Sequence, residues 1–345
     1  MSLRGNCMCS DANKTGPQIG DRVLGGIYTL LQQTKGSIGG EVTYLGRKGV
    51  CRYCGSTDAS RFRNVSHTFP EALGNKWVVS LDECDNCNKL FSVYDDALSN
   101  SVSPFLTLGG VKGKQNKIRQ TGRSSGLSVI SRQASSEPSR ISIVLRGVDA
   151  REHVFRDRAT GNIRMIYPVA SVPFKPRHAY KALVKMAIAL LPEDELDNYK
   201  KIRAWILDPN ETDYSTLLEV GLSFSAIGNA PPLAVGVLLR RAIDNDVRPR
   251  IIFVFSAGSV CLQIYLRSDS LDAQLPSDQP GILGIEWSNV IVGAAGEHIR
   301  FDYGTPLHLD WRDVATRPQP VESVTLDFSP KTTVGKFTPN FRRSP

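Results

Sequence analysis

The stretch that decides the fold, residues 51–104, contains three motifs: Cys51-Arg-Tyr-Cys54-Gly55, Ser66-His67-Thr-Phe-Pro70-Glu71-Ala-Leu73-Gly74-Asn75 and Glu83-Cys84-Asp85-Asn-Cys87-Asn88. Two Cys-x-x-Cys pairs therefore enclose one histidine. Two thiolates two residues apart can bind one metal ion from a tight turn, and a following glycine permits the backbone conformation of that turn. Two such pairs predict a structural zinc ion, Zn²⁺, bound by Cys51, Cys54, Cys84 and Cys87.

The composition favours metal binding over disulfides. The chain has 345 residues, a net charge of +8 and seven cysteines, an odd number. No apolar run approaches the roughly 20 residues of a membrane span, and the N-terminus lacks the pattern of a secretory signal. We therefore expect a cytoplasmic protein without a membrane partner, in which paired cysteines stay reduced and bind metal. The basic charge suits a polyanionic partner but does not identify one.

The pattern between and after the cysteines predicts a strand, a loop, a second strand and a helix. Residues 62–69, which include His67, are expected to form the first strand, and residues 77–81 the returning strand. Apolar residues then recur on one helical face over residues 85–103, and Pro104 follows.

Together these motifs resemble the HNH endonuclease family, and most closely its bacterial branch with an HxxPExLGN segment and an ECDxCN helix start. The resemblance covers residues 48–120. It implies a zinc-containing ββα-metal fold and an enzyme that hydrolyses DNA. It also implies that His67 is the general base, that Asn88 binds a catalytic divalent cation, Mg²⁺ or Mn²⁺, and that Asn75 orients the base. Ser80 or Asp82 could take the place of Asn75.

The second protein ligand of the catalytic cation is left open by this resemblance. The residue before the catalytic histidine is often a metal ligand in the family, and here it is Ser66, a weaker ligand. Glu71 or a backbone carbonyl is the alternative. The chemistry itself needs a group that removes a proton near neutral pH, as imidazole does, and a cation that stabilises charge on the leaving oxygen.

A basic segment follows the motif region. Between residues 111 and 151 there are nine lysines or arginines and two acidic residues. We expect its glycine-broken first part to contact phosphates, which provide affinity without sequence information. The alternative is a solvated linker. The residues expected to bind nucleic acid are Lys112, Lys114, Lys117 and Arg119.

The chain is expected to divide into an N-terminal extension (1–45), an HNH nuclease domain with zinc (46–122), a linker (123–139) and a C-terminal domain (140–345). The last part alternates short apolar strands with helices over 178–191 and 193–207, and its apolar run over residues 250–266 is expected to form a hairpin. It predicts an α+β domain with a mostly antiparallel sheet, so the fold class of the whole chain is α+β. It contains no phosphate loop and no nucleophile elbow.

The expected function is therefore a metal-dependent endonuclease acting on DNA, with RNA not excluded. HNH domains joined to a second domain resemble effectors of bacterial antiphage defence. By this analogy, residues 140–345 would sense a signal, dock a defence-system partner protein or form a homo-oligomer. The alternative from another class is a non-catalytic, zinc-stabilised protein that binds nucleic acid.

Overall fold

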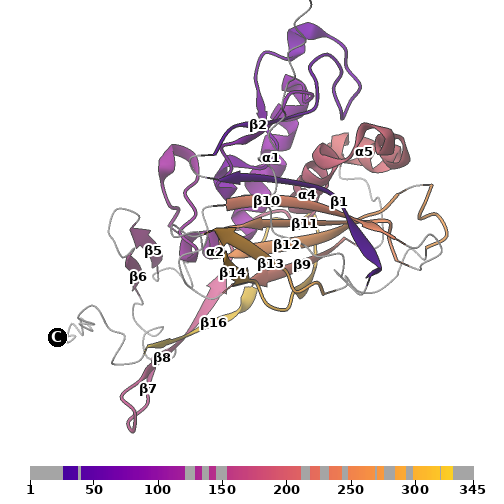
Figure 1. Ribbon diagram of the computed structural model, residues 1–345. Coiled ribbons are helices and arrows are strands. Elements are labelled where there is room, and N and C mark those ends of the chain that lie inside the picture. The colour runs from indigo at the N-terminus through magenta and orange to yellow at the C-terminus, as the bar shows by residue number, and fades with distance from the viewer. Residues whose placement is uncertain are drawn as a thin grey trace, which may run out of the picture.

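A six-stranded antiparallel sheet lies at the centre of the computed structural model (Figure 1), in the order β1-β10-β11-β12-β9-β15. Its strands are β1 (Tyr28–Ser37), β9 (Glu219–Phe224), β10 (Leu233–Arg241), β11 (Ile251–Ala257), β12 (Val260–Leu266) and β15 (Leu307–Asp310). The α+β class with a mostly antiparallel sheet is thus confirmed. The structure describes residues 26–37, 40–120, 129–133, 140–144, 154–210, 218–225, 233–242, 248–268, 270–275, 284–292, 298–318 and 320–328.

Both faces of the inner strands of this sheet are buried. Along β11, Phe253 and Phe255 belong to the core on the side of helix α4 (Pro176–Leu190), whereas Ile252 and Val254 belong to a second core on the opposite side. The second core also contains aromatic residues next to the pair of strands β13 (Ser288–Val292) and β14 (His298–Asp302). Successive side chains of a strand point to opposite faces. Since both faces are covered at β11, its residues form a continuous apolar run. The hairpin predicted for residues 250–266 is confirmed as β11 and β12.

The motif region forms a small sheet followed by helices. Strands β2 (Thr43–Leu45), β4 (Val78–Ser80) and β3 (Ser66–His67) lie in that order, with β3 antiparallel to β4. Helix α1 (Asp85–Ser101) comes next, so the predicted sequence of strand, loop, strand and helix is present. The first strand was expected over residues 62–69 but is only two residues long. The backbone N–H of Asn64 donates to the Asp85 carboxylate instead of to a neighbouring strand.

Helix α2 (Ser103–Leu108) was not expected from the sequence. Pro104, which was expected to end the preceding helix, stands in the first turn of α2. Proline is well tolerated there because the first N–H groups of a helix have no intrahelical acceptor. All six residues of α2 are buried.

The remaining elements lie around this body. Strands β7 (Val154–Arg156), β8 (Ile163–Ala170) and β16 (Pro320–Phe328) form a three-stranded sheet that extends away from it in Figure 1. The helix expected over residues 193–207 is a 3₁₀ helix, η5 (Glu193–Tyr199), followed by α5 (Lys200–Leu207). Shorter 3₁₀ turns are η2 (Ala59–Arg61), η3 (Glu71–Leu73) and η4 (Lys114–Asn116). No helix among the described residues is long and apolar enough to span a membrane.

The packing does not follow the predicted division of the chain. Strand β1 lies in the segment predicted to be an extension, yet it pairs with β10 from end to end. Strand β5 (Val129–Gln133) lies in the predicted linker and pairs with β6 (Arg140–Val144), while the rest of that linker is outside the described residues. One hydrophobic core combines residues from the 46–122 and 140–345 segments. The predicted domain boundaries stay a prediction, but these two segments share a core.

Candidate metal centre and the surrounding site

The four paired cysteines lie together. The Sγ atoms of Cys51, Cys54, Cys84 and Cys87 are all within 4.8 Å of one another. The Sγ–Sγ distance is 3.7 Å both between Cys51 and Cys87 and between Cys54 and Cys84. Four sulfurs about 2.3 Å from a tetrahedral zinc would be about 3.8 Å apart, whereas a disulfide is about 2.05 Å long. The cluster therefore fits a structural zinc ion, with all four positions filled by the protein.

Local backbone structure places these sulfurs. The N–H of Gly55 donates to the carbonyl of Cys51 at 2.8 Å, and Gly55 has a φ of +72°, a conformation that favours glycine. Cys84 precedes α1 as its N-cap residue, and its N–H points at the Cys51 sulfur at 3.5 Å. Burial raises the pKa of the Cys84 thiol. A bound divalent cation would counter this effect by stabilising the thiolate.

His67 is the second residue of β3 and is half-buried, opposite Val79 of β4. Its neighbour Ser66 is only 2% exposed. Adjacent residues of a strand point to opposite faces. Ser66 is therefore directed into the core and is not placed to bind a cation beside His67.

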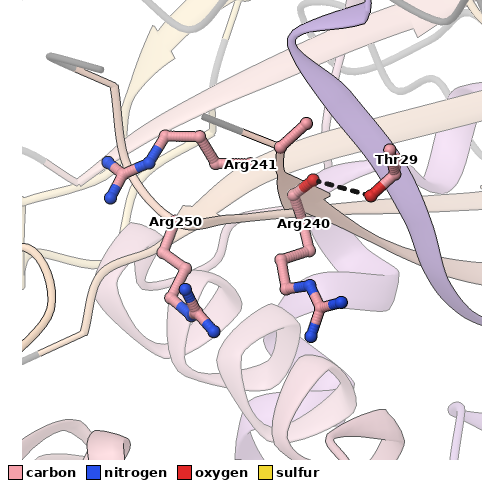
Figure 2. Close-up of a pocket in the computed structure, with 5 residues that line it drawn as sticks. Thr29, Arg240, Arg241 and Arg250 are labelled. Carbon is pink, nitrogen blue, oxygen red and sulfur yellow. Dashed lines mark hydrogen bonds between the residues drawn. The ribbon is translucent and has the colours of Figure 1, made fainter. Parts of the chain in front are cut away.

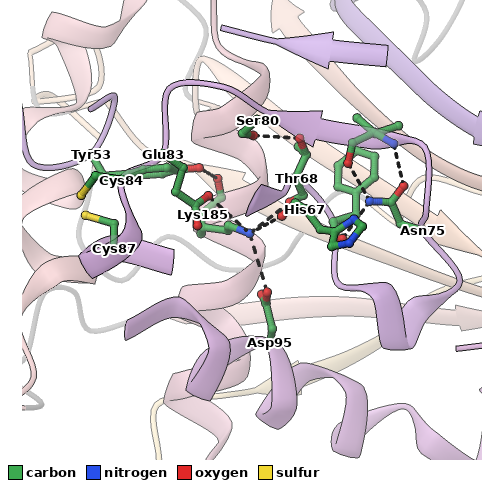
Figure 3. Close-up of polar contacts among 12 residues, drawn as sticks. Tyr53, His67, Thr68, Asn75, Ser80, Glu83, Cys84, Cys87, Asp95 and Lys185 are labelled. Carbon is green, nitrogen blue, oxygen red and sulfur yellow. Dashed lines mark hydrogen bonds and ion pairs between the residues drawn. The ribbon is translucent and has the colours of Figure 1, made fainter. Parts of the chain in front are cut away.

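Asn75 holds the loop that joins β3 to β4. Its Nδ2 donates to the carbonyls of Phe69 and Val78, both at 2.8 Å, and its Oδ1 accepts from the N–H groups of Trp77 at 3.2 Å and Val78 at 2.9 Å (Figure 3). The residue is fully buried, and these bonds use both donors and both acceptor positions of the amide. Asn75 therefore holds the backbone of this loop, and its amide has no group left to contact a substrate.

The two alternatives to Asn75 have other partners. The Ser80 hydroxyl bonds to the hydroxyl of Thr68 at 2.8 Å. The Asp82 carboxylate accepts from Arg52 Nε at 2.7 Å. Neither makes the loop contacts that Asn75 makes.

Asn88 lies near the start of α1 and is half-buried. It is seven residues before Asp95, so the two share one side of the helix about two turns apart. The Asp95 carboxylate lies 3.7 Å from Lys185 Nζ, which in turn donates to the carbonyl of His67. At the level of Asp95, this side of α1 thus faces Lys185, which contacts the histidine strand.

A buried charged cluster at this site was not predicted from the sequence (Figure 3). Lys185 of α4 is 1% exposed, and its Nζ lies 3.7 Å from carboxylate oxygens of both Glu83 and Asp95. Burial raises the pKa of Glu83 to about 7, although Lys185 acts in the opposite direction. Burial also disfavours the charged form of Lys185, but Asp95 and Glu83 outweigh it, so the pKa of Lys185 is raised and the ammonium stays charged at neutral pH. Glu83 belongs to a motif recognised in the sequence, whereas nothing local marks Lys185.

Helix α4 also contacts the cysteine turn, residues 51–55. Arg52 donates to the carbonyl of Leu191, just after the end of α4, at 2.8 Å. The Tyr53 hydroxyl donates to the carbonyl of Lys185 at 3.1 Å. Carbonyls at the end of a helix have no intrahelical partner, and Arg52 supplies one here. The cysteine turn is thus fixed to an element of the C-terminal part.

The basic loop, residues 111–119, packs against the loop that follows His67. A Cβ atom added to Gly113 would lie 3.2 Å from the Cα of Ala72, and Lys76 Nζ donates to Asn116 Oδ1 at 2.5 Å. Of the residues expected to bind nucleic acid, Lys112, Lys117 and Arg119 are exposed, and the side chain of Lys114 is outside the described residues. The structure therefore brings this basic loop next to the candidate site.

A pocket of about 320 Å³ beside β1 is lined by Thr29, Arg240, Arg241, Ala242 and Arg250 (Figure 2). The side chain of Arg241 points away from those of Arg240 and Arg250. Arg241 lies 3.5 Å from buried Asp272, and Arg240 and Arg250 share one oxygen of Glu195 at 3.8 and 2.9 Å. Carboxylates thus offset the arginine charges, and we assign no ligand to this pocket.

Comparison with protein-family models, with curated proteins and with solved structures finds no match to this chain.

Proposed function

We propose that this protein is a metal-dependent endonuclease of the HNH type that hydrolyses phosphodiester bonds in DNA. The observation that carries the proposal is a four-cysteine cluster next to a unit of strand, loop, strand and helix, in which the first strand bears His67 and the helix bears Asn88. The cysteines hold the start of α1 beside the turn before β3. Asn75 holds the loop between the strands through four hydrogen bonds.

The roles follow from this arrangement. His67 removes a proton from the attacking water, because imidazole is the side chain that exchanges protons near neutral pH. Asn88 holds the catalytic cation, Mg²⁺ or Mn²⁺. When bound, such a cation stabilises charge on the leaving oxygen of the phosphodiester. The exposed residues of the basic loop contact the phosphates on either side of the cleaved bond.

A second candidate function is zinc-stabilised binding of nucleic acid without cleavage. The observation that favours it is the burial of Ser66, which removes one expected ligand of the catalytic cation. Glu71, half-buried in the loop after His67, is the remaining acidic side chain that could replace it.

We further propose that residues 140–345 control the nuclease, for example as part of an antiphage defence effector, by binding a partner protein or by self-association. The contacts of α4 with the cysteine turn and with β3 support such control. Because the two segments share a core, the suitable test is full-length protein. Sedimentation velocity reports its oligomeric state, and a strictly monomeric protein whose nuclease activity no partner alters would remove the support for this role.

The two candidate functions are separated by incubating the purified protein with supercoiled plasmid and with a single-stranded RNA, in Mg²⁺, in Mn²⁺ and in chelator. The nuclease proposal expects nicked or linear DNA only when a divalent cation is present. Retention of nucleic acid in a gel-shift experiment, with intact substrate under every metal condition, would instead favour the binding protein. Cleavage of the RNA while the plasmid stays intact would support a nuclease whose substrate is RNA and not DNA.

A further inference from the structure

We propose that Lys185 is a positioning residue of the candidate site, which holds the strand bearing His67 from helix α4. This inference rests on the proposed nuclease function for its catalytic consequence. Its structural content, the placement of β3 by a buried lysine from the C-terminal part of the chain, can be tested without any cleavage.

Strand β3 by itself is weakly held. It has two residues and lies at the edge of its sheet, where it pairs with β4 through Ser66 opposite Ser80 and His67 opposite Val79. An edge strand leaves half of its backbone groups outside the ladder of hydrogen bonds. Lys185 Nζ donates to the carbonyl of His67 at 2.9 Å and to that of Thr68, the residue that follows β3, at 3.3 Å. The lysine thus supplies a second set of bonds to the backbone of the histidine itself.

The position of Lys185 is fixed in turn. Its ammonium lies between Glu83, which is fully buried and directly precedes a zinc-binding cysteine, and Asp95 of α1. One cation therefore ties together β3, the segment before the cysteine pair and the helix that carries Asn88. Removing an ammonium from water is costly, and an apolar side chain at such a place often gives an equal or greater stability. Packing alone does not explain a lysine here, whereas the need to orient β3 does.

The consequence for catalysis is specific. A displacement of about 1 Å in a catalytic group can lower a rate on the order of 100-fold. Lys185 is buried and touches backbone carbonyls, not the surface that a nucleic acid would meet. Loss of the lysine should therefore lower kcat and leave KM nearly unchanged.

The test compares two lysine substitutions in the full chain. Lys185→Met with Glu83→Gln removes the lysine together with the carboxylate that would otherwise stay buried and unpaired, and it is compared with Glu83→Gln alone so that the effect of losing the carboxylate is subtracted. Lys181→Met, without any change at Glu83, is the matched control. Lys181 is also 1% exposed and lies one turn earlier on α4, but its Nζ donates to the carbonyl of Asp208 at 2.7 Å and not to β3.

Hydrogen exchange of residues 66–69 and the kinetics of plasmid cleavage are measured on all three variants. We expect the Lys185 variant to bind zinc, to exchange at residues 66–69 about 10-fold faster than Glu83→Gln alone and to lose about 10-fold in kcat relative to it, with KM within about 2-fold. The control should match wild type in both measurements. The inference is overturned if the Lys185 variant exchanges and cleaves like Glu83→Gln alone, or if the control changes equally.

The experiment also covers an inactive wild type and a methionine variant that does not fold. If wild-type protein cleaves nothing, the proposed function fails, and the positioning role is judged by hydrogen exchange alone. Faster exchange at residues 66–69 in the Lys185 variant would then support that role, and unchanged exchange would overturn it. If the methionine variant does not fold, Lys185→Arg is used. Its planar guanidinium keeps the charge but has a different geometry, so exchange and kcat should still change, and wild-type values for both would overturn the inference.

Discussion

The four-cysteine cluster is expected to bind zinc, and removal of that ion should destabilise the protein by several kcal/mol and release the start of α1 from the Cys51–Cys54 turn. The perturbation is Cys84→Ser, or treatment with a strong chelator. Three of the four cysteines are buried, and Cys84 is both a ligand and the N-cap residue of α1. Two of the sulfur–sulfur distances are 3.7 Å, as in a tetrahedral zinc site, and all four sulfurs lie within 4.8 Å of one another, so binding needs only small shifts.

The size of the effect follows from the positions of the ligands. The metal closes the chain between Cys54 and Cys84, which are about 30 residues apart. A cross-link around a loop of this length removes roughly 3.5 kcal/mol of unfolded-state entropy in the chain-entropy model. Structural zinc binding in peptides at neutral pH reaches about 10 kcal/mol or more, which sets an upper value. At about 2 °C per kcal/mol, we expect the Tm to fall by at least about 7 °C.

The assay combines metal analysis with thermal unfolding. Wild-type protein should contain one zinc per chain, Cys84→Ser should contain none, and chelator should lower the Tm of the wild type but not that of Cys84→Ser. Cys261→Ala is the control, because Cys261 is a buried cysteine of the central sheet outside the cluster. A wild type without bound metal, or one whose Tm does not respond to chelator, would refute the structural zinc.

Three other predictions concern the surroundings of the site. Asn75→Ala removes four hydrogen bonds to buried backbone and should cost about 3 kcal/mol in urea unfolding; a loss below about 1 kcal/mol would contradict its role in holding the loop. Gly236→Ala places a Cβ 2.5 Å from the ring of Phe69 in the motif region and should lower the free energy of unfolding by about 1–3 kcal/mol. Gly284→Ala, whose added Cβ would have its nearest neighbour at 3.7 Å, should change it very little, and equal effects of the two substitutions would contradict the shared core. Lys112→Glu with Lys117→Glu should weaken DNA binding and reduce the slope of log K against log salt by about 2; an unchanged slope would show that these residues do not contact phosphates.

The parts of the site that sequence predicts well are those in which the chemistry is local. The cysteine pairs act through turns of a few residues, and their spacing was sufficient to predict a four-sulfur cluster, which the structure contains. The apolar run at residues 250–266 predicted a hairpin correctly because both faces of the central sheet are covered. Local pattern also located α1 to within two residues at its end.

Features that depend on distant partners were not predictable. Strand β1 is polar, lies at an edge and has an irregularity between Leu30 and Gln32, so its side chains do not alternate regularly between buried and exposed. Its pairing with β10, about 200 residues later, has no local signal. Lys185 lies on a helix predicted from apolar periodicity, where a lysine is expected to face solvent. Only the fold shows that this lysine is buried against carboxylates of the motif region.

The cleavage rate of His67→Ala is the most direct test of the proposed nuclease. Supercoiled plasmid is incubated with wild type, with His67→Ala and with His308→Ala, whose histidine is exposed on edge strand β15. Zinc content and Tm are first measured to show that the three proteins are equally folded, and cleavage is then compared in Mg²⁺, in Mn²⁺ and in chelator. We predict metal-dependent cleavage by wild type and by His308→Ala, and a rate at least about 100-fold lower for His67→Ala. Cleavage by His67→Ala at the wild-type rate would contradict the assignment of the general base.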